Sequence, residues 1–287
     1  MKVVLVGGTH GNEKTGVYLI KKWLATQGKG LPADHEYLFL LANPRATEEN
    51  RRFIDSDLNR SFGHRTQAQA HDYEFSRARE LTEQVQNWSD SEPYFLIDLH
   101  TTTSNMGVTF VLSRMDGLSA RVVQSASLNT ENSRILMNAD LDGDCVFVES
   151  IAPHGIIIEV GPVAQNVYDS RRIELTEMAV HRVLQALADM ESDKERQPPA
   201  ELDLYQEKRI IRFPQVPHEH PPCVIHPDLV GGDYSVLMNG MPVFIQSDGE
   251  VICWQEEEIY PVFINEAAYL PQQVAFMATR KVKVAFP

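Results

Sequence analysis

The sequence predicts an α/β fold, with a mostly parallel central sheet in a larger first domain and a smaller β-rich domain after it. Three observations predict this arrangement. Over the first two thirds of the chain, short apolar runs of strand length alternate with helical segments, as in parallel sheets covered by helices. The segment from Glu191 to Ala200 is charged and contains prolines, which is typical of a linker. From Leu202 onward, short alternating segments are separated by glycine-containing turns. We therefore expect one domain over residues 1–195 and a second over residues 196–287.

Each element follows from a local pattern along the chain. A strand is predicted where a short apolar run stands between polar segments, and a helix where apolar residues recur at helical spacing. The predicted strands are Lys2–Val6, Tyr37–Leu41, Tyr94–Leu99, Val108–Leu112 and Ile156–Val160. The predicted helices are Thr15–Leu24, Asp72–Val85, Leu118–Ala126 and Ile173–Met190. In the second domain, the turns are predicted at Gly231-Gly232, Asn239-Gly240 and Asp248-Gly249, before a β-like end at Val274–Val284.

The composition is that of an ordinary globular protein with a strong negative charge. Apolar residues make up 43% and charged residues 23% of the chain, and the net charge is −14. This charge argues against a nucleic-acid partner, because phosphates require a basic face. It also means that a small anionic substrate would need local arginines or lysines in its binding site. We expect a small-molecule partner, and the sequence leaves assembly into a homo-oligomer open.

The sequence indicates no association with a membrane. The longest apolar stretches, such as Gly155 to Pro162, are far too short to span a bilayer, and the N-terminus has no cleavable signal pattern. The three cysteines, Cys145, Cys223 and Cys253, are too few and too scattered for a disulfide framework. They do not form a zinc-binding CxxC pair either. We therefore expect a cytoplasmic protein.

The most informative motif is Gly7-Gly8-Thr9-His10-Gly11-Asn12-Glu13, which directly follows the first predicted strand. A His and a Glu three residues apart at a strand-to-helix turn can face one point in space. Together they can hold a divalent metal ion and leave coordination positions open for water. The spacing alone is weak evidence, because His71 and Glu74 repeat it in a predicted surface helix. The position strengthens the case for His10 and Glu13, since ligands bind beyond the carboxyl ends of strands in open α/β sheets.

A third metal ligand is expected at the end of another strand. The apolar run from Tyr94 to Leu99 closes with His100, whose imidazole could complete a metal site. Asp98 could orient that imidazole, as carboxylates commonly do for metal-bound histidines. The alternative is a core or capping role for His100, with Asp98 as the N-cap of the following turn.

Glu159 is the sharpest anomaly, because it is an ionisable residue within a hydrophobic strand. A carboxylate in such a place is costly unless it is paired or functional. Burial raises the pKa of a carboxyl group and a nearby metal lowers it, so that Glu159 could act as a general base. The alternative is a residue at a strand edge whose side chain points to solvent.

The polar segment from Arg51 to Arg60 contains groups that recognise carboxylates. An arginine binds a carboxylate through two parallel hydrogen bonds, and the neighbouring Asn59 amide can donate a further one. An arginine near the metal could also polarise a carbonyl group and stabilise an oxyanion. The alternative is a solvated loop with local Asp–Arg pairs, and the pattern does not choose between Arg51 and Arg52.

Six blocks, spread over nearly the whole chain, form a recognisable pattern. The blocks are Gly7-Gly8-Thr9-His10-Gly11-Asn12-Glu13, Asp55-Ser56-Asp57-Leu58-Asn59-Arg60-Ser61-Phe62, Asp98-Leu99-His100, Thr102-Thr103-Ser104-Asn105-Met106-Gly107, Glu159-Val160-Gly161-Pro162 and Asn265-Glu266-Ala267-Ala268-Tyr269. In this order they resemble the aspartoacylase family, which includes a related aminoacylase that acts on other N-acylated amino acids. Several blocks are five or more residues long, so the resemblance is specific.

The resemblance implies a fold and a cofactor. The first domain is expected to be a zinc-carboxypeptidase-like catalytic domain, and the C-terminal domain is expected to cap the active site. One zinc ion per chain is implied, with His10, Glu13 and His100 as its ligands.

The resemblance also implies the catalytic and substrate-binding residues. Glu159 would contact the substrate, activate the attacking water and later donate the proton to the leaving amine. Arg52 would bind and polarise the scissile carbonyl, while Asn59 and Arg60 would hold the α-carboxylate of the amino acid. Tyr269 would reach the substrate from the second domain.

One departure from the family pattern concerns the side chain of the substrate. Animal aspartoacylases carry an Arg ten residues and a Tyr fourteen residues before the Glu of the Glu-Val-Gly-Pro block, and this chain has Glu149 and Cys145 there. The leading hypothesis is hydrolysis of N-acetyl-L-aspartate to acetate and L-aspartate. One alternative is an aminoacylase for N-acetylated aromatic or neutral amino acids, which the missing Arg favours. The others are a succinylglutamate-deacylating relative and a non-catalytic protein that binds an amino acid or a metal on the same scaffold.

Overall fold

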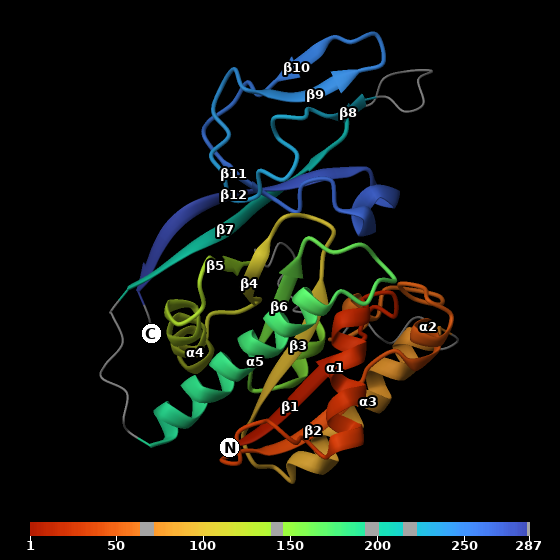
Figure 1. The fold of residues 1–287 in the computed structure, drawn as a ribbon, viewed down its shortest axis with the longest axis vertical. Coiled ribbons are helices and arrows are strands. Elements are labelled where there is room, and N and C mark those ends of the chain that lie inside the picture. The colour runs from red at the N-terminus through yellow and green to blue at the C-terminus, as the bar shows by residue number, and fades with distance from the viewer. Residues whose placement is uncertain (64–71, 139–145, 193–200, 215–222, 286–287) are drawn as a thin grey trace.

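A nine-stranded sheet crosses the centre of the molecule (Figure 1). The structure is a computed structural model, and it describes residues 1–63, 72–138, 146–192, 201–214 and 223–285. The strand order across the sheet is β11-β12-β7-β5-β4-β6-β3-β1-β2. In chain order these strands are β1 (Lys2–Gly7), β2 (Glu36–Leu41), β3 (Tyr94–Thr101), β4 (Gly107–Leu112), β5 (Ser133–Met137), β6 (His154–Gly161), β7 (Glu201–Arg212), β11 (Tyr260–Val262) and β12 (Val274–Ala285).

The five strands predicted for the first domain lie together and are mostly parallel. β1 pairs in parallel with β2 on one side and with β3 on the other, and β3 pairs in parallel with β6. β4 runs antiparallel to β6, and β5, which was not predicted, pairs in parallel with β4. The prediction of a mostly parallel central sheet is confirmed, with one reversal of direction between β6 and β4.

Helices cover both faces of this part of the sheet. α1, α4 and α5 pack on one face around buried residues such as Val3 and Phe95, whereas α3 packs on the other face with Val6 and Leu96. Alternate residues of one strand point to opposite faces, which explains why these strands are apolar at nearly every position. The helices are α1 (Lys14–Thr26), α2 (Pro44–Glu48), α3 (Tyr73–Ser89), α4 (Gly117–Leu128) and α5 (Ser170–Glu191), with short 3-10 helices η1 (Leu58–Arg60), η3 (Val148–Ile151) and η4 (Ala267–Gln272).

In the part of the chain that the structure describes, none of the helices has the length and apolar character needed to cross a membrane.

Most of the long helices begin at an aspartate cap. The carboxylate of Asp72 accepts a hydrogen bond from the Glu74 N–H at 2.9 Å, and Asp116 and Asp169 cap α4 and α5 in the same way. Such caps satisfy N–H groups that have no partner within the helix. At α1 the N-cap position is Glu13, whose side chain makes no capping bond. Its carboxylate is therefore available for another purpose.

The last third of the chain is β-rich, as predicted. β7 pairs in parallel with β5 and antiparallel with β12, so the two long C-terminal strands extend the central sheet. A separate three-stranded antiparallel sheet contains β8 (Cys223–Ile225), β9 (Pro242–Gln246) and β10 (Val251–Cys253). Figure 1 shows this small sheet at the end of the molecule that is remote from the N-terminus. Positive φ angles at Gly231, Gly240 and Gly249 mark the three predicted turns. The domain ranges 1–195 and 196–287 stay predictions, and residues 193–200 of the predicted linker lie outside the described residues.

The carboxyl ends of β1, β3 and β6 meet at one edge of the sheet. These three strands are parallel neighbours, so the residues at their ends face a common region. On the β4–β6 side of this region, Val111 and Ile157 pack with Val262 and Phe263 from the C-terminal part of the chain. The fold therefore places a wall of C-terminal residues beside the strand ends that carry the predicted ligands.

Candidate metal centre and active-site cavity

His10 and Glu13 lie in the tight turn between β1 and α1. Gly11 allows this turn to pack closely against α2, because an added Cβ would lie 2.1 Å from the carbonyl carbon of Ala46. The Gly11 N–H also donates to the carbonyl oxygen of Arg52 at 3.1 Å. His10 Nδ1 lies 2.6 Å from Glu13 Oε1, and both side chains are buried. The turn therefore holds an imidazole and a carboxylate side by side.

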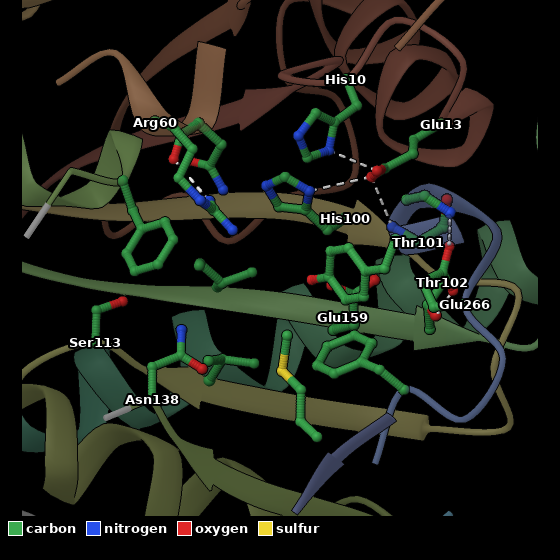
Figure 2. Close-up of a pocket in the computed structure, with 18 of the residues that line it drawn as sticks. His10, Glu13, Arg60, His100, Thr101, Thr102, Ser113, Asn138, Glu159 and Glu266 are labelled. Atoms are coloured by element: carbon green, nitrogen blue, oxygen red, sulfur yellow. Dashed lines mark hydrogen bonds and ion pairs between the residues drawn. The ribbon is translucent and has the colours of Figure 1, made fainter. Parts of the chain in front are cut away.

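His100, near the end of β3, completes the cluster (Figure 2). Its Nδ1 lies 3.1 Å from Glu13 Oε2, and its ring centroid lies 4.8 Å from that of His10. The backbone N–H of Thr101 donates to Glu13 Oε2 at 2.9 Å, which fixes the carboxylate between the two rings. One ligand atom from each of the three side chains lies within 4.8 Å of the others. The structure thus brings together the three residues predicted as metal ligands.

Each imidazole also contacts an aspartate through its other ring nitrogen, Nε2. His10 Nε2 lies 3.0 Å from Asp57 Oδ1, and His100 Nε2 lies 2.5 Å from Asp98 Oδ2. Asp98 also accepts a hydrogen bond from the Thr9 hydroxyl at 2.8 Å. Partners of this kind orient metal-binding histidines, and here they direct Nδ1 of both rings towards Glu13. Asp98 was predicted to orient its histidine, whereas Asp57 was missed, because only the fold brings it to His10.

The charges of the cluster compensate one another. Burial raises the pKa of Glu13, but His10 and His100 lower it more, and the net pKa is well below the usual value. Burial lowers the pKa of His100, but Asp98 and Glu13 raise it well above 6.5. Two imidazoles and one carboxylate are also a donor set of catalytic zinc sites, which keep one coordination position open. The residues present therefore fit a zinc ion.

Glu74 has a structural role. It belongs to the second His-Glu pair with a spacing of three residues, His71 and Glu74. It is fully buried, and its carboxylate accepts hydrogen bonds from the N–H groups of residues 54–56 at 2.7 to 3.2 Å. Asp55 and Asp72 lie near it, and their carboxylates also accept backbone N–H groups. His71 lies outside the described residues. This acidic group therefore holds the loop that follows Arg52.

Arg52 points into the site and Arg51 points away from it. The Arg52 side chain is 17% exposed and forms ion pairs with Glu13 at 3.3 Å and Asp57 at 3.2 Å. The Arg51 side chain is 54% exposed and pairs with Glu49 at the surface. The local sequence pattern did not separate these two arginines, and their burial does.

Asn59 and Arg60 form part of the cavity wall at η1. The side-chain oxygen of Asn59 accepts a hydrogen bond from the Val148 N–H at 3.0 Å, so its amide NH₂ group is the end that can serve a ligand. The Arg60 guanidinium lies 4.6 Å from the centroid of the Phe147 ring and donates to the Asn59 carbonyl oxygen at 2.8 Å. These contacts hold a positive charge at the cavity surface.

Glu159 lies on β6, beside His100 in one neighbouring strand and Thr109 in the other. It is 9% exposed and lines the cavity, and its Oε1 has no hydrogen-bond partner within the described residues. Burial raises its pKa well above the usual value of 4.5, opposed by His100 and reinforced by Glu13. The side chain therefore faces the cavity rather than bulk solvent.

Tyr269 enters the cavity from η4 in the C-terminal part of the chain. Glu266 holds it there. One carboxylate oxygen of Glu266 accepts hydrogen bonds from the Thr102 hydroxyl and from the Thr103 N–H, at 2.7 Å for the latter. The other oxygen caps η4 by accepting the Ala268 N–H at 3.0 Å. Glu266 was missed as a site residue, although it lies in a block that contributed to the resemblance.

These side chains line one cavity of about 420 Å³. The cluster of His10, Glu13 and His100 lies at one end, and Ser113 and Asn138 lie across the cavity from it (Figure 2). Apolar and aromatic side chains make up much of the remaining wall, namely Val111, Val146, Phe147, Ile157, Ile210, Phe263 and Met277. Among the described lining residues, Arg52 and Arg60 are the only arginines and there is no lysine.

Glu149, which replaces the Arg of animal aspartoacylases, is buried next to Ser113. The Ser113 hydroxyl donates to Glu149 Oε1, and Oε2 has no hydrogen-bond partner within the described residues. Burial raises the pKa of Glu149 to about 7. Cys145, the other position of this departure, lies outside the described residues.

The raised pKa of Glu149 predicts a dependence of stability on pH. Because the folded pKa exceeds the unfolded one, ionisation opposes folding, and stability is lost as pH rises from about 4.5 through about 7. The full difference is about 3 kcal/mol.

Glu149→Gln should therefore raise the free energy of unfolding, relative to the wild type, more at pH 8.5 than at pH 4.5. Urea denaturation at both pH values measures this, with Glu177→Gln in α5, at a partly exposed carboxylate that pairs with Lys22, as the control. An effect of Glu149→Gln that is equal at the two pH values would contradict the prediction.

Comparisons with known proteins find similarity over nearly the whole chain. A family model for the succinylglutamate desuccinylase/aspartoacylase catalytic domain matches residues 1–187, and one for the AstE/AspA barrel-sandwich hybrid domain matches residues 200–281. The chain is 38% identical to an N-acyl-aromatic-L-amino acid amidohydrolase (carboxylate-forming) of Xenopus tropicalis, over 100% of this chain and 94% of that protein. It is 33% identical to a probable aspartoacylase of Trichodesmium erythraeum, over 99% of this chain and 98% of that protein. The crystal structure of murine aminoacylase 3 matches with a TM-score of 0.89 at 31% identity, over 100% of this chain and 97% of that one.

Proposed function

The chain belongs to the succinylglutamate desuccinylase/aspartoacylase family, and we propose that it is an amidohydrolase that cleaves an N-acylated amino acid into a carboxylic acid and the free amino acid. The observation that carries this proposal is the presence of His10, Glu13, His100 and Glu159 in one cavity. Metal ligands beside a buried carboxylate are a hydrolytic arrangement. A protein that only bound an amino acid or a metal would have no use for such a base.

His10, Glu13 and His100 would hold one zinc ion per chain. A zinc ion in this position supplies Lewis acidity, which lowers the pKa of water to about 7 and polarises a carbonyl oxygen. Asp57 and Asp98 keep the two imidazoles oriented for this role. Their hydrogen bonds to Nε2 leave Nδ1 of each ring facing Glu13.

The positive charges of the cavity would bind the polar parts of the substrate. Arg60 and the amide NH₂ of Asn59 would hold the α-carboxylate, since both groups are donors on the same wall. Arg52, which is paired with Glu13 beside the metal ligands, would donate to the oxygen of the scissile carbonyl and stabilise the charge that develops on it. Tyr269 would add a hydrogen bond from the C-terminal part of the chain.

Glu159 would move the proton. A water molecule attacks the acyl carbon and gives a proton to the carboxylate of Glu159, which lines the cavity. When the C–N bond breaks, Glu159 returns that proton to the nitrogen of the leaving amino acid. The acyl group leaves as a carboxylic acid, and its remaining proton passes to the released amine, so that the products are a carboxylate and an ammonium group. The carboxyl group of Glu159 thus ends the cycle in the state in which it began.

The cavity favours a neutral side chain on the substrate. N-acetyl-L-aspartate would bring a second carboxylate into the cavity. Both arginines among the described lining residues already have proposed roles. An unpaired carboxylate in a largely apolar cavity is costly. The alternative of N-acyl aromatic amino acids fits the apolar wall better, and it is the activity in the name of the Xenopus tropicalis relative.

A cytoplasmic location belongs to the same proposal and is supported by the free thiols of Cys223 and Cys253.

A screen for acetate release tests the proposed function. We expect the purified protein to hydrolyse N-acetyl-L-phenylalanine with a kcat/KM at least about tenfold above that for N-acetyl-L-aspartate, because the latter carries the unpaired charge. A chelator should abolish release of acetate from both, and added zinc should restore it. Failure to release acetate from any N-acetyl amino acid, with zinc present, would disprove the proposal.

A further inference from the structure

The cavity continues beyond the proposed catalytic residues to a polar end at Ser113 and Asn138. Figure 2 shows both side chains across the cavity from Glu13, with the Ser113 hydroxyl directed inwards. Neither residue has a role in the hydrolysis proposed above. A polar group at the far end of an otherwise apolar wall is the kind of feature that fixes the identity of a ligand.

The register of the sheet indicates how far this end lies from the reacting bond. Thr109 of β4 pairs with Glu159, and Val111 pairs with Ile157. Ser113 comes next on the same face, just beyond β4, because alternate residues of a strand point to the same side. At about 3.3 Å per residue, Ser113 is about 13 Å along the sheet from Glu159. A substrate that is cleaved beside Glu159 can reach Ser113 only through a long side chain.

The hydrogen bonds of Ser113 determine what it can offer to a ligand. A serine hydroxyl has one proton and two lone pairs. Its proton is donated to Glu149, a carboxylate that is 3% exposed and whose Oε2 has no partner within the described residues. The Ser113 oxygen therefore presents lone pairs to the cavity. It is an acceptor, and the negative charge of Glu149 behind it makes it a stronger one.

We propose that Ser113, supported by Glu149, recognises a hydrogen-bond donor at the tip of an aromatic substrate side chain, such as the phenol of an N-acyl-L-tyrosine. This inference rests on the proposed function and names its substrate more closely. The wall before Ser113 contains Val111, Phe147 and Ile157, which suit a ring.

Two other kinds of side chain fit less well. A carboxylate at this end would face the acceptor oxygen of Ser113 and the charge of Glu149, so acidic side chains are excluded by repulsion. A cationic side chain would pass the guanidinium of Arg60, which lies over Phe147 on the same wall. A neutral donor avoids both penalties.

A substrate series on the unmodified protein tests the inference directly. The probes are N-acetyl-L-tyrosine, N-acetyl-O-methyl-L-tyrosine and N-acetyl-L-phenylalanine, assayed at pH 8.5. At this pH Glu149, with a pKa of about 7, is ionised, and the phenol is still protonated. We expect kcat/KM for the tyrosine substrate to exceed that for each of the other two by about tenfold, because only the phenol can donate to Ser113.

A pair of serine variants tests the residue. Ser113→Ala should reduce the ratio of kcat/KM between the tyrosine and phenylalanine substrates to within about twofold of one, with the phenylalanine value little changed. The matched control is Ser119→Ala in α4, which removes a buried hydroxyl that accepts the Gly155 N–H at 3.1 Å. This control should keep the ratio of the wild type.

The possible outcomes separate this inference from the proposed function. The deciding quantity is the ratio of kcat/KM between the tyrosine and phenylalanine substrates. If this ratio is near one in the wild type, or if it is unchanged in Ser113→Ala, the assignment of Ser113 is overturned while amide hydrolysis stands. Absence of acetate release from all three substrates overturns the proposed function instead. If Ser113→Ala does not fold, the comparison of tyrosine with its O-methyl ether in the wild type still decides.

Discussion

Replacement of Glu159 by glutamine is expected to lower kcat by about a thousandfold, the loss typical of removing a general base. Glutamine keeps the volume of the side chain but cannot accept a proton from water or return one to the amine. Glu159 is not one of the three side chains whose ligand atoms cluster, so zinc should remain bound. Substrate binding should also persist, because Arg52, Asn59 and Arg60 are unchanged.

The measurements are steady-state kinetics on N-acetyl-L-phenylalanine and the zinc content of the dialysed protein. Glu177→Gln provides the matched control, since it makes the same chemical change at a glutamate that pairs with Lys22 on the outside of the molecule. This control should keep the activity of the wild type. Near-normal turnover of Glu159→Gln with zinc bound would show that another group takes the proton.

The strands and helices around the site could be predicted because their signals are local. β1, β3 and β6 are covered on both faces and therefore read as continuous apolar runs, and α1, α3, α4 and α5 carry helical periodicity. β5 was missed, because its first residues, Ser133 and Arg134, are polar and only partly buried. The reversal of β4 against β6 was also not predicted, since pairing direction depends on contacts between segments distant in sequence.

The metal cluster could be predicted because each ligand has a local mark. His10 and Glu13 lie three residues apart in a glycine-rich turn, and His100 closes an apolar run. Asp57 and Glu266 lack such a mark, because acidic residues in polar segments are ordinary. Only the fold brings Asp57 to His10 and brings Glu266 to Thr102, which is 164 residues away in the chain.

The polar end of the cavity was beyond sequence analysis for a related reason. Glu149 departs from the family pattern in the sequence, but the effect of this departure depends on which side chain accepts or donates a hydrogen bond next to it. Ser113 has no local mark in the sequence, because a serine after a strand is common. Because the Ser113 hydroxyl donates its proton to Glu149, the Ser113 oxygen becomes a hydrogen-bond acceptor that faces the cavity.

Replacement of His100 by asparagine is expected to remove the metal and to reduce activity at least about a thousandfold, since the metal lowers the pKa of water to about 7. His100 is the one predicted ligand from β3, and its two ring nitrogens contact Glu13 and Asp98. The shorter asparagine side chain cannot span both carboxylates. Two buried carboxylates would then lose their shared partner, which adds a cost in stability.

Zinc content and thermal unfolding together test this prediction. In the wild type, zinc at about a thousandfold above its dissociation constant should stabilise the fold by about 4 kcal/mol, and a chelator should reverse the effect. His100→Asn should lose both the bound zinc and this response. The matched control is His154→Asn at the start of β6, where His154 is half-buried and pairs with Asp116 at 2.8 Å, away from the cluster. Full zinc content and unchanged kinetics in His100→Asn would mean that the cluster of His10, Glu13 and His100 is not the metal site. The roles of Glu159 and Arg52, which depend on a metal beside them, would then lose their support.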